Sequence, residues 1–560
     1  MALTGRKRLG DLLIEAGFIT QQQLAEALEA QKGSGIKLGE ILLKRNLVSE
    51  TQIIHALEKL MGIKYVNLEN YMIEPDAPTL IGENLARKHK IIPIGRRGSI
   101  LTVAMEDPLN IFAIEDVRMV TGLEVVPVVS RAQEILNAIE QHYGKVVAQE
   151  AVDDFRKQYG TEELSDIDTE TLNEINSAPV VRLVNSLIRQ AIKAGASDIH
   201  VEPYEDHVRI RFRIDGELQE IMSPAKSTHA AMVTRIKIMG NMDIAERRKT
   251  QDGRVETVVD GRGVDMRISI LPSIYGEKVV IRLLDRGNMA FGKVQLGFSE
   301  AAMSEFDRII SSPHGVILVT GPTGSGKTTT LYAALKELNK DNVNIVTLED
   351  PVEYRLDGIT QVHVNPKADL TFANGLRSIL RQDPDIIMVG EIRDAETAQI
   401  AVRAAITGHL VLSTVHTNDT ASTVSRLVDM GVEPYLVSAS VVGIIAQRLV
   451  RKTCEICGAV YEADEVTANL LDVEPGTQLR RGPGCPACSF TGYRGRTAIF
   501  EIMPMYVDIR KLIDDRATVE EIRAAAGRHN MITLRDNCRR LVLEGVTTVD
   551  ELLRVTYTVD

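Results

Sequence analysis

One glycine-rich run combines the residue types and the spacing needed to bind the phosphates of a nucleotide. It fits the pattern G-x-x-x-x-G-K-[ST] and consists of Gly321, Pro322, Thr323, Gly324, Ser325, Gly326, Lys327 and Thr328, with Thr329 directly after it. Main-chain N–H groups of such a loop converge on phosphate oxygens, and the N-terminus of the following helix adds partial positive charge. Lys327 can reach the β- and γ-phosphates, and Thr328 can ligate Mg²⁺. We therefore predict a site for ATP and Mg²⁺.

The flanking residues predict the elements that must position this loop. The apolar, β-branched-rich run 316–319 precedes it and has the length of a buried strand. Residues 329–338 follow, with leucines at helical spacing. Strand, glycine turn and helix form the context that the pattern requires, so a chance glycine turn is the weaker interpretation.

Carboxylates follow two other strand-like runs. One run ends at Glu349, which Glu353 soon follows, and another run leads into Glu391. The carboxyl ends of parallel strands lie at the sheet edge where ligands bind, so these acids are expected beside the phosphates. Hydrolysis needs a carboxylate to orient or deprotonate water, for which Glu353 and Glu349 are candidates; an acidic loop facing solvent is the alternative. Glu391 is expected to hold the Mg²⁺ shell.

Two Cys-x-x-Cys pairs form a second chemical signal. They are Cys454, Cys457, Cys485 and Cys488, with 27 residues between the pairs. The pattern is typical of a closed tetrahedral zinc site with a structural role. Disulfides are the alternative, which a reducing compartment disfavours. The fifth cysteine, Cys538, lies on a helical pattern and is expected to be an ordinary thiol, buried or half-buried.

Length and charge limit the possible classes of function. A chain of 560 residues is too long for one core, so three or four domains are expected. The formal net charge of −12 disfavours a general nucleic-acid binder, and no nucleic-acid partner is expected. The sequence shows no secretory signal peptide and no apolar run of the roughly 18 to 20 residues that span a bilayer. We therefore expect a cytoplasmic protein that reaches a membrane only through a partner.

A repeat marks the amino-terminal third. A spaced set of residues recurs after a shift of 29, and Thr20 and Ser49 each begin a capping-box pattern, which predicts tandem helical hairpins. We divide the chain into a helical tandem-repeat domain at 1–62, a small α/β interaction module at 63–143, an acidic linker at 144–175, an α+β domain at 176–290, and a P-loop domain at 291–560 with a zinc subdomain at about 450–500.

Arginines characterise the fourth of these parts. A helical pattern from Pro179 precedes alternating strands, and the strand-like run 208–214 carries three arginines on one face and apolar residues on the other. We expect these arginines to be without carboxylate partners. Such a face is usually solvated; the alternative is that arginines of this domain complete the positive charge around a γ-phosphate.

Several runs in the chain resemble those of the secretion ATPase superfamily, which powers type II secretion and type IV pili. Beside the P-loop and the cysteine pairs, the matching runs are Gly195–His200, Gln251–Arg254, Glu349–Glu353, Asp383–Asp394 and Gly408–Asn418. The resemblance covers essentially the whole chain. It implies an α/β multidomain protein, in which an α+β (PAS-like) domain precedes a RecA-like P-loop core. It also implies a homohexamer that acts on an inner-membrane platform protein and is peripheral at that membrane through its partners.

The same resemblance assigns roles to charged residues. It makes Glu353 the first choice for the catalytic acid and places Glu391 where most P-loop enzymes have an aspartate. Positions matching Arg254 and Arg267 face the nucleotide from beside the core, and Arg282 is the weaker candidate.

The resemblance also assigns roles in the remaining two runs. It makes His416 a sensor of the γ-phosphate, and His409 is the less favoured histidine. Arg393 and Asp394 are expected to serve structure or the contact between subunits.

The first amino-terminal repeat resembles the cyclic-di-GMP-binding domains found on some pilus and secretion ATPases. The matching residues are Arg8, Leu9, Gly10, Leu13, Gly17, Leu24, Leu28 and Gln31. The second copy departs from the pattern, with Lys37, Asn46 and Leu60 in place of arginine, glycine and glutamine. A lysine cannot make the planar bidentate contact of an arginine, so binding at the second copy is left open. The resemblance implies cyclic-di-GMP as a regulator.

The combined resemblance implies an ATP-hydrolysing hexameric motor that assembles a type IV pilus. A large amino-terminal extension and the cysteine pairs are shared with assembly and secretion motors rather than with retraction motors. A type II secretion ATPase is the alternative. Two less favoured alternatives are a nucleic-acid-translocating P-loop motor, which the lack of an aromatic stacking platform disfavours, and a nucleotide-binding regulatory scaffold without turnover.

Overall fold

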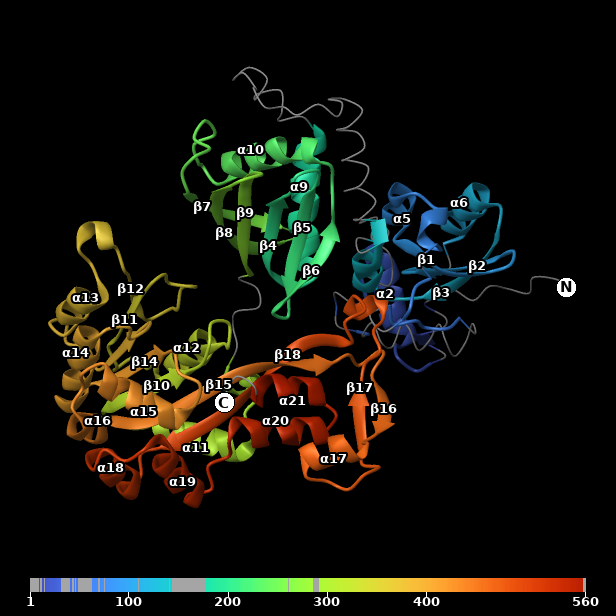
Figure 1. Ribbon diagram of the computed structural model, residues 1–560. Coiled ribbons are helices and arrows are strands. Elements are labelled where there is room, and N and C mark those ends of the chain that lie inside the picture. Colours follow the sequence, from blue (N-terminus) through green and yellow to red (C-terminus); the bar gives the residue numbers. More distant parts are fainter. Residues whose placement is uncertain are drawn as a thin grey trace.

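The computed structural model groups the chain into units that are built around separate sheets (Figure 1). It describes residues 178–259, 261–285 and 292–556, and in the amino-terminal region residues 10, 13–14, 16–31, 41–42, 45, 47–48, 63–68, 71–74, 76–108, 110–139 and 142–143. Within these ranges there are sheets of three, six, seven and two strands.

The first described helix, α2 (Gln21–Gln31), begins at a cap that the sequence predicts. Gln23 N donates to Thr20 Oγ1 at 3.2 Å, and Thr20 N donates to Gln23 Oε1 at 2.8 Å. Each side chain thus satisfies a main-chain N–H group at the helix start, as in a capping box. The second predicted cap, at Ser49 and Gln52, lies outside the described residues.

A three-stranded sheet of order β1-β2-β3 forms the next unit. β1 and β2 are antiparallel, whereas β2 and β3 are parallel and are joined through α6. The elements are η1 (Pro78–Leu80), α5 (Glu83–His89), β1 (Ile91–Arg97), β2 (Ile100–Met105), α6 (Ile111–Thr121) and β3 (Glu124–Val129).

The middle unit is an antiparallel sheet of order β6-β5-β4-β9-β8-β7 with helices on its apolar face. Alternation of residue types divides the sheet into an apolar face and a charged face: Val208, Ile210 and Phe212 of β5 are buried, and the arginines between them are half-buried. The elements are α9 (Ala178–Lys193), β4 (Ala196–Pro203), β5 (Val208–Ile214), β6 (Glu217–Met222), η2 (Lys226–Thr228), α10 (His229–Met239), β7 (Gln251–Val259), β8 (Arg262–Ser273) and β9 (Gly276–Asp285).

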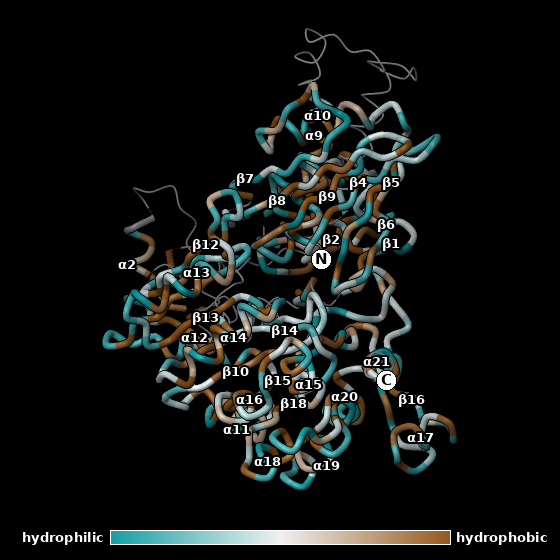
Figure 2. The backbone as a smooth tube through the Cα atoms, turned by 60° about the vertical axis from the view of Figure 1, so that its left-hand side comes forward, coloured by the Kyte–Doolittle hydropathy of each residue, from teal (hydrophilic) through white to brown (hydrophobic). Residues whose placement is uncertain are grey.

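The core sheet has the order β12-β11-β13-β14-β10-β15-β18 and is parallel except for β18. Val316 and Leu318 of β10 pack in the cluster around α13, α14 and α15, while Ile317 and Val319 pack in the cluster around α11 and α12. Apolar side chains on both faces explain why the predicted strands are continuous apolar runs. Figure 2 shows hydrophobic residues concentrated in these central strands.

The elements of this unit follow the chain order. They are η4 (Lys293–Leu296), α11 (Glu300–Ile310), β10 (Gly315–Thr320), α12 (Lys327–Leu338), β11 (Ile345–Glu349), β12 (Thr360–His363), η5 (Pro366–Ala368), α13 (Phe372–Ile379), β13 (Ile386–Val389), α14 (Ala395–Ile406), β14 (Leu410–Val415), α15 (Thr420–Asp429), α16 (Pro434–Ser440), β15 (Val441–Thr453) and β18 (Tyr493–Pro504).

An arm leaves the core between β15 and β18, which pair with each other far beyond the end of β10. Within the described residues four helices follow β18, and Cys538 on α20 is fully buried in an apolar cluster, in agreement with the prediction of an ordinary thiol. The elements of arm and helices are β16 (Ala459–Glu462), α17 (Glu465–Leu471), β17 (Gln478–Arg481), η6 (Pro486–Cys488), α18 (Val507–Asp514), α19 (Val519–Arg528), α20 (Leu534–Leu543) and α21 (Val549–Thr556).

Candidate active site

The glycine-rich loop lies between β10 and the first residue of α12, Lys327, in the predicted order of strand, turn and helix. Its glycines are needed on steric grounds. Gly326 has a φ of 89°, and a Cβ there would lie 2.8 Å from Nε2 of Gln447 on β15. A Cβ on Gly321 would lie 2.5 Å from the Gln447 carbonyl oxygen. The main-chain contact excludes a side chain at Gly321, and the left-handed backbone conformation disfavours one at Gly326.

Lys327 lies folded against its own loop. Its Nζ donates to the carbonyl oxygens of Gly321 at 2.8 Å and Pro322 at 3.0 Å. Burial lowers the pKa of this ammonium group to about 8, although the charge of Glu391 acts in the opposite direction. The lysine is thus a desolvated cation that an anion would stabilise.

The positions of Ser325 and Thr328 also fit a nucleoside triphosphate with Mg²⁺. Within the described ranges, the buried Oγ of Ser325 has no hydrogen-bond partner. An unpaired buried hydroxyl costs free energy, which a phosphate oxygen would offset by accepting a hydrogen bond from it. Thr328 is the second residue of α12, at the helix N-terminus where phosphate and metal bind in such loops.

Glu391 follows β13 and lies between two basic side chains. Its Oε1 is 2.5 Å from a guanidinium nitrogen of Arg393, and its Oε2 is 3.4 Å from Nε2 of His416. His416 follows β14, the neighbouring strand, and is about half exposed. The structure therefore brings Lys327, Glu391 and His416 to one edge of the sheet. Arg393, expected to serve structure or a subunit contact, pairs with the candidate metal-holding acid within this chain.

Two further residues of these runs lie away from that cluster. His409 precedes β14 at the opposite end of the strand, and its Nδ1 lies 2.8 Å from the carbonyl oxygen of Ala404. Asp394 caps α14 by accepting a hydrogen bond from Thr397 N at 2.8 Å. Both side chains are occupied by the ends of secondary-structure elements.

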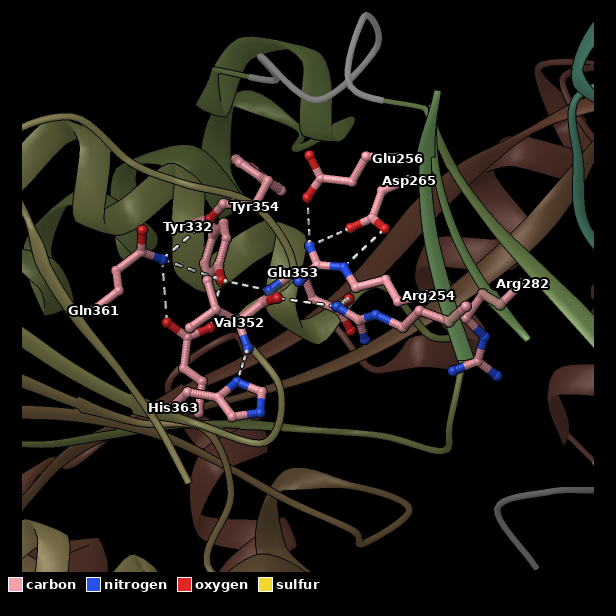
Figure 3. Close-up of polar contacts among 12 residues, drawn as sticks. Arg254, Glu256, Asp265, Arg282, Tyr332, Val352, Glu353, Tyr354, Gln361 and His363 are labelled. Carbon is pink, nitrogen blue, oxygen red and sulfur yellow. Dashed lines mark hydrogen bonds and ion pairs between the residues drawn. The ribbon is translucent and has the colours of Figure 1, made fainter. Parts of the chain in front are cut away.

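Glu353 lies in the loop after β11 and is bound by an arginine of the middle unit (Figure 3). Arg267 of β8 places a guanidinium nitrogen 3.2 Å from Glu353 Oε2 and donates to the Val352 carbonyl at 2.9 Å. Arg267 thus reaches the candidate active site from the side that the resemblance implies, but in this arrangement it neutralises the candidate catalytic acid.

Other arginines of the middle unit are also paired, so the expectation that they lack carboxylate partners is wrong. Arg254 makes a bidentate contact with Asp265, at 3.0 and 2.6 Å. Arg282 lies 3.2 Å from Asp198. In both pairs the carboxylate belongs to an adjacent strand, which alternation within one strand cannot reveal.

Arg209 and Arg211 of β5 share one carboxylate on the adjacent strand. They contact Glu202 of β4 at 3.4 and 2.9 Å. Although burial raises the pKa of Glu202, hydrogen bonds and charges from Arg211 and Lys278 outweigh this effect and lower it to about 2. The face is a paired charge network.

Sequence analysis missed Gln447 and Arg448, which lie on β15 beneath the P-loop. Gln447 Oε1 accepts a hydrogen bond from Thr330 of α12 at 2.7 Å. A guanidinium nitrogen of Arg448 donates to the Asn418 carbonyl, just after His416, at 2.8 Å. The available signal in the sequence was a glutamine and an arginine within the apolar run 441–450, because a charge in a buried strand requires a specific environment. In the structure Arg448 is 5% exposed.

The four predicted cysteines meet at the base of the arm. Their Sγ atoms all lie within 4.8 Å of one another, and neighbouring sulfurs are 3.7 to 4.0 Å apart. Four sulfurs at about 2.3 Å from a tetrahedral Zn²⁺ would be about 3.8 Å apart, so the donor set fits zinc. Burial raises the pKa of Cys488, but N–H groups of Cys485 and Gly492 outweigh this and lower it to about 7.

The predicted cyclic-di-GMP residues fall partly within the described ranges. A Cβ on Gly10 would lie 2.5 Å from Leu24 Cδ1, and Leu13 is fully buried, so these positions pack a small core. Leu28 is 40% exposed on α2. Gly17 has a φ of 75°, and Gln31 is the last residue of α2. Arg8 and Leu9 lie outside the described residues.

Comparison with known families accounts for this arrangement. Residues 173–554 match the family described as type II/IV secretion system protein. The chain belongs to this family. Residues 61–149 match the MshEN domain, a segment that begins after the residues Arg8 to Gln31. The resemblance inferred from the sequence is thereby confirmed at the level of the family.

Relatives of this family extend over most or all of the chain. The type IV pilus assembly ATPase PilB of Myxococcus xanthus is 44% identical over 557 residues, 98% of each chain. The type II secretion system protein E of Pectobacterium carotovorum is 52% identical over 398 residues, 70% of this chain and 79% of the relative.

A solved structure shares the fold of the family core. The ATPase DotB of Yersinia pseudotuberculosis, at 20% identity and a TM-score of 0.52, aligns over 71% of this chain and 96% of its own. The predicted RecA-like P-loop core is thus confirmed. None of the helices in the described ranges is long and apolar enough to cross a membrane.

Proposed function

We propose that this chain is the subunit of a homohexameric ATPase motor that assembles a type IV pilus at an inner-membrane platform protein. The observation that carries the proposal is the meeting of the P-loop Lys327, Glu391 and the Arg267–Glu353 pair along one side of the core. Pilus assembly in particular is supported by the similarity to a pilus assembly ATPase along 98% of both chains. Cyclic-di-GMP is proposed as a regulator through the amino-terminal domains.

Each group at the site has a distinct part in hydrolysis. The main chain of residues 321–329 and Lys327 hold the phosphates, while Thr328 and Glu391 would hold Mg²⁺, which supplies positive charge to the β- and γ-phosphate oxygens. Glu353 orients the attacking water and accepts its proton. His416 contacts the γ-phosphate from the end of β14.

The arginines of the middle unit connect hydrolysis with movement. Arg267 holds Glu353 in the present arrangement. A displacement of the middle unit that carries Arg267 from Glu353 to the phosphates would free the carboxylate as a base and bring positive charge to the transition state. Arg254 would follow on the adjacent strand. Hydrolysis is thereby coupled to the relative orientation of middle unit and core.

Type II secretion is the second candidate, because protein E of Pectobacterium carotovorum is more similar over the shared 70% of the chain. The two candidates differ in the membrane partner. Restoration of pilus assembly in a strain that lacks its own assembly ATPase, without restoration of exoprotein secretion in a strain that lacks protein E, is the expected result. The reverse pattern would assign the chain to secretion.

The enzymatic proposal is tested by two substitutions with opposite signatures. Lys327→Ala is expected to abolish ATP binding, because it removes the phosphate-binding cation. Glu353→Ala is expected to retain binding and to lower Mg²⁺-dependent phosphate release by at least about 100-fold, the usual contribution of a general base. Glu520→Ala on an exposed turn of α19 is the matched control and should match the wild type.

Three outcomes contradict parts of this proposal. Wild-type turnover of Glu353→Ala would move the catalytic role to another residue. ATP binding without phosphate release, even with the platform protein present, would favour a regulatory scaffold. Stimulation of turnover by DNA, but not by the platform protein, would favour a nucleic-acid motor.

A further inference from the structure

Tyr332 is a fully buried tyrosine on α12, the helix that begins at the P-loop lysine. Its hydroxyl lies among polar groups of β11 and of the segment that follows it (Figure 3). It donates to Glu349 Oε2, and it accepts from Glu353 N at 3.3 Å and from Gln361 Nε2 at 3.4 Å. One hydroxyl therefore joins the helix of the P-loop to the main chain of the candidate catalytic acid.

Glu349 determines the direction of these hydrogen bonds. It is 3% exposed, and its Oε1 accepts from Thr347 Oγ1 at 2.5 Å and from Gln361 Nε2 at 3.2 Å. A carboxylate only accepts, so Tyr332 must donate its single O–H group in a hydrogen bond to Glu349. The lone pairs of the Tyr332 oxygen then remain available for the N–H group of Glu353.

The same contacts remove Glu349 from the chemistry itself. Burial raises the pKa of Glu349, although hydrogen bonds from Thr347, Tyr332 and Gln361 act to lower it. Burial, together with the negative charge of Glu349, also raises the pKa of Tyr332, so the phenol keeps its proton. Glu349 therefore faces the interior and is fully engaged, while the side chain of Glu353 points toward the middle unit through Arg267.

We propose that Tyr332 and Glu349 are positioning residues, which hold the main chain of Glu353 at a fixed place relative to the P-loop. The inference rests on the role of Glu353 in the proposed function. When Arg267 leaves Glu353, the hydrogen bond from Glu353 N to the Tyr332 hydroxyl continues to hold the loop after β11 against α12. A displacement of a catalytic group by about 1 Å can cost about 100-fold in rate, so a single main-chain hydrogen bond has a measurable effect on turnover.

A packing role for Tyr332 makes a different prediction. Its ring meets the ring of Tyr354 edge-on, with centroids 4.6 Å apart and planes at 74°. Phenylalanine keeps this aromatic contact and removes only the hydroxyl. If the ring alone matters, Tyr332→Phe leaves turnover unchanged.

The test measures turnover and binding separately in the full-length assembled protein. Tyr332→Phe is expected to lower kcat for ATP about 10- to 100-fold. The affinity for a non-hydrolysable ATP analogue should stay within about twofold of wild type, because the contacts of Lys327 are untouched. Tyr354→Phe removes a hydroxyl from the adjacent ring and is the matched control, with kcat at the wild-type level.

Combined substitutions test whether Tyr332, Glu349 and Glu353 act through the same hydrogen-bonded contact. Glu349→Gln should lower kcat to a similar extent, and Tyr332→Phe with Glu349→Gln should be no worse than the stronger single variant, because both act through one contact. Adding Tyr332→Phe to Glu353→Gln should cause no further loss. If Glu353→Gln hydrolyses ATP at the wild-type rate, the proposed role of Glu353 fails; if it is slow while Tyr332→Phe is at the wild-type rate, only the positioning inference fails.

The thermal stability of the same variants is measured as a control for a folding defect. Thermal unfolding of Tyr332→Phe should be cooperative, and a loss of ATP-analogue affinity parallel to the loss of kcat would overturn the inference in favour of a folding defect. Should Tyr332→Phe not fold, Gln361→Met supplies the test. Gln361 is only half-buried and donates to both Glu349 and Tyr332, so kcat should fall while binding is retained, and unchanged kcat overturns the inference.

Discussion

The protonation state of the Lys327 ammonium group makes anion binding at the P-loop dependent on pH. Its contacts are main-chain carbonyls of its own loop, and burial lowers its pKa to about 8 from the ordinary value of 10.5. Bound phosphates favour the charged form, so the pKa of Lys327 in the nucleotide complex is higher than in the free protein. Above pH 8, therefore, binding ATP requires the uptake of a proton.

The expected result is an affinity for ATP that is constant below pH 8 and falls above it. The dissociation constant should rise by up to about tenfold per pH unit between pH 8 and the pKa of the complex. A fluorescent ATP analogue titrated between pH 7 and 9.5 measures this slope, since the terminal phosphate has its own pKa near 6, outside the window. A dissociation constant that does not change over this range contradicts a desolvated lysine.

At the residue scale, the sequence is most informative where a motif specifies the residue type at each position. The P-loop is such a case, because a Cβ on Gly321 would collide with the main chain of Gln447 and Gly326 adopts a positive φ. The pairing of Arg267 with Glu353 was beyond reach, because it depends on how two separate units dock. Tyr332 has the sequence signature of an ordinary core residue, and only the position of its hydroxyl distinguishes it.

At the scale of elements, the paired strands β15 and β18 form the frame for the cysteine site. β15 ends at Thr453, beside Cys454, and β18 begins at Tyr493, so the two strand ends hold both cysteine pairs close together. The cysteine spacing predicted the ligand set from sequence. The antiparallel pairing of β15 with β18 was not predicted, because the register of distant strands depends on the intervening arm.

Zinc removal should loosen the base of this arm without unfolding the core. The purified protein is expected to contain about one zinc per chain, since four buried thiols at tetrahedral spacing form a closed structural site. Cys457→Ser should lose most of the metal and become sensitive to proteases within residues 454–492. Metal analysis and limited proteolysis measure these effects.

Cys538→Ser serves as the control, because Cys538 lies in a separate apolar cluster. It should keep the metal and the protease resistance of the wild type. If mass spectrometry shows a zinc-free protein with two disulfides, the cysteine pairs form disulfides and not a zinc site.

At the scale of the whole molecule, the described residues of the middle unit contact the rest of the chain through polar side chains, and two of these contacts concern the core sheet and its loops. One is the Arg267–Glu353 pair. The other is the turn after β5, where Asp215 Oδ2 accepts from Gly495 N at 2.8 Å and Oδ1 lies 3.2 Å from Arg496. The order of units along the chain could be read from sequence composition and motifs. The contacts between units could not, because they are formed by exposed polar side chains without periodicity.

Removing the Asp215 side chain should change the hydrogen-exchange rate of a single amide, that of Gly495. In Asp215→Ala, the Gly495 N–H group loses its acceptor, and its hydrogen exchange should accelerate about tenfold, which corresponds to one hydrogen bond of about 1 to 1.5 kcal/mol. Amides in the centre of β10 should exchange at the wild-type rate. Asp206→Ala, in an exposed turn of the same unit, is the matched control, and an unchanged Gly495 amide would show that the units do not dock here in solution.

The strand pair β15–β18 extends well beyond the strand that leads into the P-loop. β15 pairs with the P-loop strand only as far as Ala446 and continues to Thr453. This overhang is about 20 Å long, so a tilt of about 10° at the nucleotide end would displace the cysteine-bearing tip by about 3.5 Å. A small change in strand direction beside the P-loop is thereby amplified at the end of the strand pair that carries the four cysteines.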